Sequence, residues 1–256
     1  MRYKIEHIKR NIKNRKNRIW IFGVHAVTAA LLNPNRVKHR LMLTPNASKK
    51  FLDIPKTKAI KVEITTAKQF CPPLDNNSAH QGAALEADPL KWGPVQEICK
   101  PDTRPKFVVL LDRLTDPNNV GAIIRSAEVF GSSAVIAPLR YSAPETGALA
   151  KSASGALERQ PYIRVKNLSQ EIERLKKLGY WCIGLEGSSE TNLEDGLIKR
   201  FPEGSFALVL GGEGKGLREL TKRNCDELVR IGENRFFGSL NVSNAAAVAM
   251  FCIKKR

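Results

Sequence analysis

The hydrophobic pattern of the chain changes near residue 105. After that point, short apolar runs alternate with segments of helical spacing, which is typical of a mostly parallel sheet covered by helices on both faces. The apolar runs predict strands at 107–112, 134–137, 181–185 and 206–210. The helical spacing predicts helices at 120–130, 171–178 and 242–253. The last of these helices is apolar nearly all round, so we expect it to be buried.

Before residue 89 the pattern is mixed and predicts a small α+β domain. It combines a helix at 25–32 with strands at 40–43, 61–64 and 81–86. Four prolines then fall between residues 89 and 105, where they exclude a continuous helix or a central strand. We therefore divide the chain into a basic flexible arm, a small domain, a linker and a larger α/β domain. Their expected bounds are 1–18, 19–88, 89–105 and 106–256.

The chain is strongly basic, and the charge is unevenly placed. It has 42 lysines and arginines against 25 acids, a net charge of +17, and eight of these cations lie within residues 1–18 with a single acid. Cations set against phosphates release condensed counterions, so this excess favours a polyanionic partner. Nucleic acid is the first candidate and an anionic membrane surface the second. Charge alone does not choose between RNA and DNA.

Cysteine and histidine spacing argues against a metal site. The five cysteines are odd in number and form no C-x-x-C pair, and the four histidines show no ligand spacing. We expect that the protein binds no metal and that it resides in the reducing cytoplasm. The basic arm and the apolar run at 19–32 superficially copy a signal peptide. His25 interrupts that run and Asn33-Pro34 ends it as a helix stop does, so we do not expect export or a membrane span.

Three segments of the larger domain could carry chemistry, and each follows or precedes a predicted element. They are DRLTDPNNVGAIIR at 112–125, GGEGKGL at 211–217 and GSLNVSNAAA at 238–247. In the first, Asn118 or Asn119 is the expected N-cap of the helix. The second does not have the spacing of a P-loop or of G-x-G-x-x-G. Taken singly, each segment also fits a helix cap or a tight turn. Together they lie at the edge where open α/β sheets bind ligands.

Taken in order, the three segments resemble the three motifs of the SpoU/TrmH branch of the SPOUT RNA methyltransferases. Residues 21–44 and 79–90 are similar to the small substrate-binding domain of the ribosomal-RNA ribose methyltransferases. The resemblance implies a mostly parallel α/β domain with a C-terminal trefoil knot, and a small L30e-like α+β domain before it. It also implies a homodimer that transfers a methyl group from S-adenosylmethionine to a ribose 2′-hydroxyl of RNA. The 23S rRNA (guanosine-2′-O)-methyltransferases are the most similar group.

The resemblance also implies a set of site residues. Those expected to bind the cofactor are Leu210, Gly211, Gly212, Glu213, Ile231, Leu240 and Asn241. Those expected to face the acceptor ribose are Asn119, Arg125, Glu213, Ser239 and Asn241. A guanidinium group remains protonated in proteins. We therefore interpret Arg125 as a fixed positive charge that lowers the pKa of the 2′-hydroxyl, with the proton leaving to water or to a phosphate oxygen.

Two positions depart from the family pattern. Gly232 follows Ile231 where a proline is common, and Asn244 stands where many relatives have valine. The cofactor contacts near Ile231 and the role of Asn244 therefore stay open. Two other functions also stay open: 2′-O-methylation of tRNA, and a catalytically silent RNA-binding assembly factor. The presence of Asn119, Arg125, Glu213 and Asn241 favours the enzyme.

We expect the basic arm to bind phosphates without contributing to the cofactor site. Deleting residues 1–18 should weaken RNA affinity and make it less dependent on salt, because fewer counterions are released on binding. RNA dissociation constants measured over a series of salt concentrations test this. An unchanged salt dependence, or a loss of cofactor binding, would contradict it.

Overall fold

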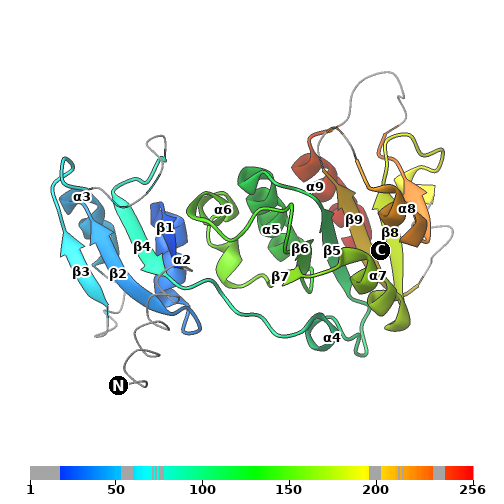
Figure 1. Cartoon of the computed structure of the whole chain (residues 1–256), viewed down its shortest axis with the longest axis horizontal. Helices are drawn as coiled ribbons and strands as arrows, with labels where there is room; N and C mark the ends of the chain where they lie inside the picture. Colours follow the sequence, from blue (N-terminus) through cyan, green and yellow to red (C-terminus); the bar gives the residue numbers. More distant parts are fainter. Residues whose placement is uncertain are drawn as a thin grey trace, which may run out of the picture. The chain divides into compact units, whose positions relative to one another are not determined.

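The computed structural model describes residues 18–52, 60–70, 72, 74, 78–195, 203–212, 214, 216–232 and 240–255. The basic arm, apart from Arg18, lies outside this range. The chain forms two compact units (Figure 1). The first contains residues up to Lys91 together with Glu145–Glu158. The second contains Trp92–Pro144 and the chain from Arg159 onward.

The first unit is built on a four-stranded sheet of order β1-β4-β2-β3. β4 pairs antiparallel with β1 and β2, whereas β2 and β3 are parallel. The strands are β1 (Ile19–Phe22), β2 (Lys38–Leu43), β3 (Lys61–Ile64) and β4 (Ala83–Ala87). The helices are α2 (Val24–Leu32), α3 (Pro45–Ser48) and α6 (Gly147–Ala153), with the 3-10 turns η1 (Lys49–Phe51) and η2 (Ala156–Glu158). Residues 145–158 thus join a sheet that is distant in the sequence.

A buried ion-pair cluster links residues 145–158 to the rest of the first unit. The Arg36 guanidinium donates to Glu145 and to Glu158, at 2.5 Å each. It also donates to the backbone oxygen of Asp88 at 2.8 Å, and Asn33 donates to Glu158 at 2.8 Å. A buried charge is tolerated only when it is paired and hydrogen-bonded, and Arg36 meets both conditions.

The second unit is a six-stranded parallel sheet of order β10-β8-β9-β5-β6-β7. The strands are β5 (Phe107–Asp112), β6 (Val135–Pro138), β7 (Tyr162–Val165), β8 (Tyr180–Leu185), β9 (Ser205–Gly211) and β10 (Glu227–Val229). The central strands β5 and β9 are nearly continuous apolar runs, as expected when both faces of a sheet are covered. The predicted parallel α/β fold is confirmed.

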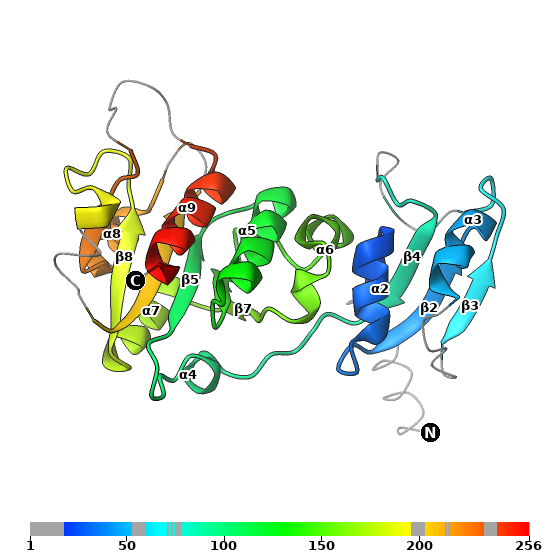
Figure 2. The same cartoon turned by 180° about the vertical axis from the view of Figure 1, so that it is seen from behind.

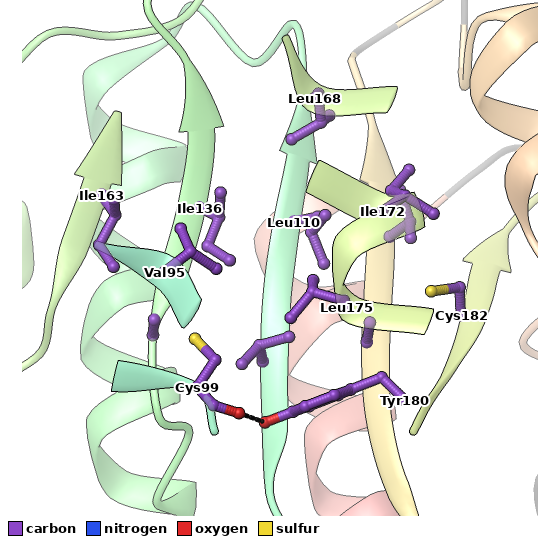
Figure 3. Packing of buried hydrophobic residues seen from close by; sticks show 14 of the residues in the cluster. Val95, Cys99, Leu110, Ile136, Ile163, Leu168, Ile172, Leu175, Tyr180 and Cys182 are labelled. Carbon is purple, nitrogen blue, oxygen red and sulfur yellow. Dashed lines mark hydrogen bonds between the residues drawn. The ribbon is translucent and has the colours of Figure 1, made fainter. Parts of the chain in front are cut away.

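Helices cover both faces of this sheet. They are α4 (Val95–Ile98), α5 (Pro117–Phe130), α7 (Leu168–Lys177), α8 (Glu219–Asn224) and α9 (Val242–Lys254). Helices α5 and α9 pack side by side on one face (Figure 2). Helices α4 and α7 lie on the other, where Val95, Ile172 and Leu175 pack against Leu110 of β5 (Figure 3).

The segment predicted as a linker packs against the second unit instead of hanging free. It contains the single helical turn α4, and both Val95 and Cys99 are buried. The Tyr180 hydroxyl donates to the backbone oxygen of Cys99 at 2.6 Å (Figure 3). The prolines limit the helix to one turn, as expected, but they do not prevent burial. The bounds predicted for the arm, the two domains and the linker remain a prediction.

Most of the predicted elements are confirmed, with ends that differ by up to three residues. β1, β7, β10, α3, α4, α6 and α8 were not predicted. The expected N-cap was wrong: Asp116, and not Asn118 or Asn119, caps α5 by accepting from both of their backbone N–H groups. Pro117 then occupies the first helical turn, which its fixed φ favours.

The expectation of a fully buried final helix was also wrong. α9 buries Ala246, Ala249 and Met250, but Phe251 is 53% exposed and Val248 is 41% exposed. The expectation failed because α9 is apolar on all sides, whereas only one stripe of it faces the sheet. Among the described residues, no helix is long and apolar enough to cross a membrane.

Candidate functional site

The structure brings the first and third motifs together. The Asn241 side chain donates from Nδ2 to Oδ1 of Asn119 at 3.0 Å, although the two residues are 122 positions apart in the sequence. The Oδ1 of Asn241 meanwhile caps α9 by accepting from the backbone N–H of Ser243 at 2.9 Å and of Asn244 at 3.4 Å. One amide side chain therefore starts α9 and joins it to the first turn of α5.

A pocket of about 240 Å³ lies at this junction. Its lining comes from the carboxyl end of β5 and the N-terminal turns of α5 and α9; the residues are Arg113, Leu114, Thr115, Asp116, Asn119 and Val242. Ligands of open parallel sheets bind at this edge. The N-termini of α5 and α9 add positive ends of helix dipoles, which favour negative charge that develops there.

The glycine-rich second motif folds back on itself beside this edge. The Gly216 N–H donates to the Gly212 oxygen at 3.0 Å. A Cβ on Gly211 would lie 2.2 Å from the backbone carbon of Gly216, and one on Gly212 would lie 2.8 Å from the Arg113 oxygen. Both glycines are thus required by close backbone approach within the protein.

The buried Asp112 fixes the exit of this loop. It is 1% exposed and lies at the end of β5. Its carboxylate accepts from Arg218 Nε at 2.7 Å, from the Arg218 backbone N–H at 3.2 Å and from Thr221 Oγ1 at 2.7 Å. The start of α8 is therefore tied to the same strand end as the pocket.

The residues predicted to bind the cofactor fall into three groups. The Leu210 side chain is part of the core, so only its backbone can contact a ligand. Gly211, Gly212 and Ile231 are partly exposed, and Leu240 and Asn241 are exposed. Glu213, which was predicted for both sets, and Ser239, which was predicted to face the ribose, lie outside the described residues.

Arg125 lies apart from the pocket within a single chain. It occupies the third turn of α5, is exposed, and does not line the pocket beside Asn119. Six helical positions rotate a side chain by about 240°, so Arg125 and Asn119 do not share a face of α5. Arg125 and Val129 do share one, since they are four positions apart.

Sequence reasoning missed Arg113, Thr115, Asp116 and Asp112. The signal for Asp112 was present, because an acid that ends a run of buried apolar residues needs a partner. Arg113 gave no comparable signal in the sequence, because its place in the pocket lining depends on how two loops of the folded chain meet.

Reactive thiols and metal clusters do not contribute to this edge in the part of the chain that the structure describes. Burial raises the pKa of the Cys99 and Cys225 thiols to about 12, so both stay protonated at neutral pH. No group of three or more histidine, cysteine, aspartate or glutamate residues that could hold a metal ion occurs among the described residues.

A parallel α/β sheet with a pocket and polar amides at its carboxyl edge defines a ligand-binding α/β protein. The matches to known families are more specific. Residues 106–251 match the SpoU rRNA Methylase family, and residues 20–93 match the RNA 2′-O ribose methyltransferase substrate binding domain. The chain belongs to the SpoU rRNA methylase family, which confirms the predicted class of enzyme, an S-adenosylmethionine-dependent RNA 2′-O-methyltransferase.

Two curated relatives carry the same description. The 23S rRNA (guanosine-2′-O-)-methyltransferase RlmB of Pseudomonas putida is 34% identical over 90% of this chain and 94% of its own length. Its counterpart in Coxiella burnetii is 35% identical over 92% of this chain and 95% of its own length.

Solved structures share the fold. The SpoU methyltransferase AviRb from Streptomyces viridochromogenes, in complex with AdoMet, superposes with a TM-score of 0.77 at 21% identity, covering 96% of this chain and 92% of its own. An AdoMet-bound rRNA methyltransferase from Sinorhizobium meliloti gives a TM-score of 0.74 at 20% identity, covering 96% and 90%.

The two roles of Asn241 can be separated by substitution. Asn241→Ala should lower the free energy of unfolding by about 1 kcal/mol through loss of the cap, and should also lower methyltransferase activity. Asn241→Ser keeps a capping oxygen but cannot reach Asn119, so it should retain stability and still lose activity. Chemical denaturation and methyl-transfer assays on both variants test this. Full activity in Asn241→Ser would show that the link to Asn119 is not needed.

Proposed function

We propose that this protein transfers a methyl group from S-adenosylmethionine to the ribose 2′-hydroxyl of a guanosine in 23S rRNA. The contact between Asn241 and Asn119 at the edge of the 240 Å³ pocket carries the proposal, because it unites the family's first and third motifs at the sheet edge where ligands bind. The substrate follows from the curated relatives, which match nearly the whole chain. A ribosomal RNA substrate also fits a cytoplasmic enzyme and the net charge of +17.

The cofactor binds against the second and third motifs in this proposal. Gly211 and Gly212 offer backbone groups, while Ile231 and the half-exposed Leu240 offer apolar surface for an adenosyl group. Glu213 completes this set. The bound cofactor supplies the methyl group as an electrophilic sulfonium. No metal is required for this displacement.

The residues of this chain orient the ribose and stabilise its oxygen. Asn119 and Asn241 hold each other in place through their side-chain amides, so both are positioned before the ribose binds beside them. Arg125 acts as a positive charge that favours the ionised 2′-oxygen, with Ser239 completing the contacts. The proton leaves to water or to a phosphate oxygen.

We further propose that two copies associate through the face formed by α5 and α9. Val129 is 72% exposed and Phe251 is 53% exposed on these neighbouring helices, and Phe251 packs edge-on against Phe130 at 6.3 Å between ring centroids. Exposed apolar side chains grouped on one face are typical of a protein interface. Arg125 lies on the same side of α5 as Val129, so a second copy bound to this face would lie next to Arg125.

Two finer features of the fold belong to this proposal as well. The trefoil knot would involve the segment after β10, of which residues 233–239 lie outside the described range. The L30e-like character of the first unit is supported by its small α+β sheet. Both rest on the family resemblance.

The reaction can be tested directly with purified protein. We expect labelled methyl groups from S-adenosylmethionine to appear in unmodified 23S rRNA transcripts as 2′-O-methylguanosine, identified by nuclease digestion and mass spectrometry. Arg125→Ala should lower kcat about 100- to 1,000-fold and leave cofactor affinity unchanged, because one fixed charge is removed. Arg104→Ala, another arginine of the second unit, is the control.

Other outcomes identify the alternatives. Methylation of tRNA in place of 23S rRNA would indicate a tRNA enzyme. Failure to bind S-adenosylmethionine at millimolar concentration would indicate a silent RNA-binding factor. Near-normal turnover of Arg125→Ala would contradict the role of that residue.

The dimer interface has a separate test. Phe251→Asp places a charge on the exposed face of α9 and should convert a dimer into a monomer in light scattering at micromolar concentration. Leu52→Asp, at an exposed leucine of the first unit, should leave the mass unchanged. A wild-type monomer, or an unaltered dimer in Phe251→Asp, would contradict this interface.

A further inference from the structure

A second pocket, of about 300 Å³, lies at the carboxyl ends of β5, β6 and β7. Four cationic residues line it, namely Arg113, Arg140, Lys166 and Arg218, and no acidic residue does. In the described part of the chain, no carboxylate forms an ion pair with Arg113, Arg140 or Lys166. The methyl-transfer site described above does not account for this concentration of positive charge.

Two of the lining residues adopt a backbone conformation that side chains other than glycine rarely take. Arg113 has φ of +62° and Tyr141 has φ of +60°. The Arg113 guanidinium lies over the Tyr141 ring, 4.9 Å from its centroid, and Tyr141 is still 67% exposed. Strained backbone persists where the surroundings hold it, and it is concentrated at functional sites. An exposed aromatic ring held in this way provides a stacking surface.

The loop that carries Arg140 and Tyr141 is held in place by side chains of β7, which donate hydrogen bonds to the loop's carbonyl oxygens. The Arg164 guanidinium of β7 donates to the oxygen of Leu139 at 2.7 Å, of Ala143 at 3.0 Å and of Pro138 at 3.1 Å. The Tyr162 hydroxyl also donates to the Ala143 oxygen, at 2.6 Å. These bonds fix the loop before any ligand arrives, so binding there does not require the loop to be ordered first.

The opposite wall of the pocket is equally well held. Arg218 uses its Nε and its backbone N–H for the buried Asp112. No described residue accepts a hydrogen bond from its Nη groups. Helix α7 begins at Leu168, next to Lys166, and its N-terminal end adds a partial positive charge to this edge.

We propose that this second pocket binds the single-stranded RNA next to the acceptor nucleotide. Tyr141 stacks on a base, while Arg140, Lys166 and Arg218 contact the backbone phosphates. Arg113 lines both pockets, so they adjoin, and an RNA chain whose ribose lies beside Asn119 continues into the cationic pocket. The inference rests on the proposed function, because it places the flanking part of the same RNA substrate.

The phosphate contacts are tested by removing two charges. Arg140→Gln/Lys166→Gln should weaken binding of the 23S rRNA transcript. The slope of log affinity against log salt should become shallower by about 1.4, which corresponds to two lost contacts to single-stranded RNA. The control is Lys100→Gln/Lys177→Gln, which removes the same charge from exposed lysines outside the pocket. It should leave the slope close to that of wild type.

The stacking contact has its own pair of variants. Tyr141→Ala should lower RNA affinity about 5- to 150-fold without changing the salt slope, because base stacking is not a counterion effect. Tyr141→Phe keeps the ring and should bind as wild type does. Thermal unfolding of each variant checks that the fold is retained.

The outcomes separate this inference from the proposed function. Equal RNA binding by wild type and Arg140→Gln/Lys166→Gln, or equal weakening in the lysine control, would overturn the pocket assignment even if wild type methylates rRNA. A loss of S-adenosylmethionine affinity with unchanged RNA affinity would also overturn it, because the cations would then bind the cofactor carboxylate. A wild-type protein that binds RNA but methylates none would contradict the proposed function alone.

Discussion

The carboxylate of Asp112 is the interaction on which the candidate site depends. Asp112 ends the central strand β5 and lies opposite Gly211 of β9. Its bonds to Arg218 and Thr221 hold the far end of the glycine-rich loop, whose near end is the continuation of β9. A buried carboxylate without these donors would be costly, so the strand end, the loop and the start of α8 adopt one arrangement together.

Much of the second unit was predictable because its strands are buried on both faces. β5 was predicted with its observed bounds, since the short continuous apolar run FVVLLD is typical of a strand covered on both faces. The helix starts were harder. Asp116, Asn118 and Asn119 are all good capping residues, and the feature that favours Asp116 is its neighbour Pro117, whose fixed φ suits the first helical position. For α9, composition could not show that Phe251 faces away from the sheet.

The candidate site was predictable to the extent that it rests on motifs. The family pattern named Asn119 and Asn241, and the fold brings them into contact. The spacing of six positions already separates Arg125 from Asn119 around α5, but only the fold shows that the face carrying Asn119 is the one that lines the pocket. The pattern also could not find the pairing of Arg113 with Tyr141, which needs two loops with left-handed residues to meet.

The membership of residues 145–158 in the first unit has a consequence for how this protein can be taken apart. The chain passes between the two units three times, so neither unit is a continuous stretch of sequence. A fragment ending at Lys91 would keep Arg36 but lose both of the carboxylates that neutralise it. The first unit is therefore completed by a segment that lies between two stretches of the second, so cutting the chain after Lys91 would leave a buried arginine without its carboxylate partners.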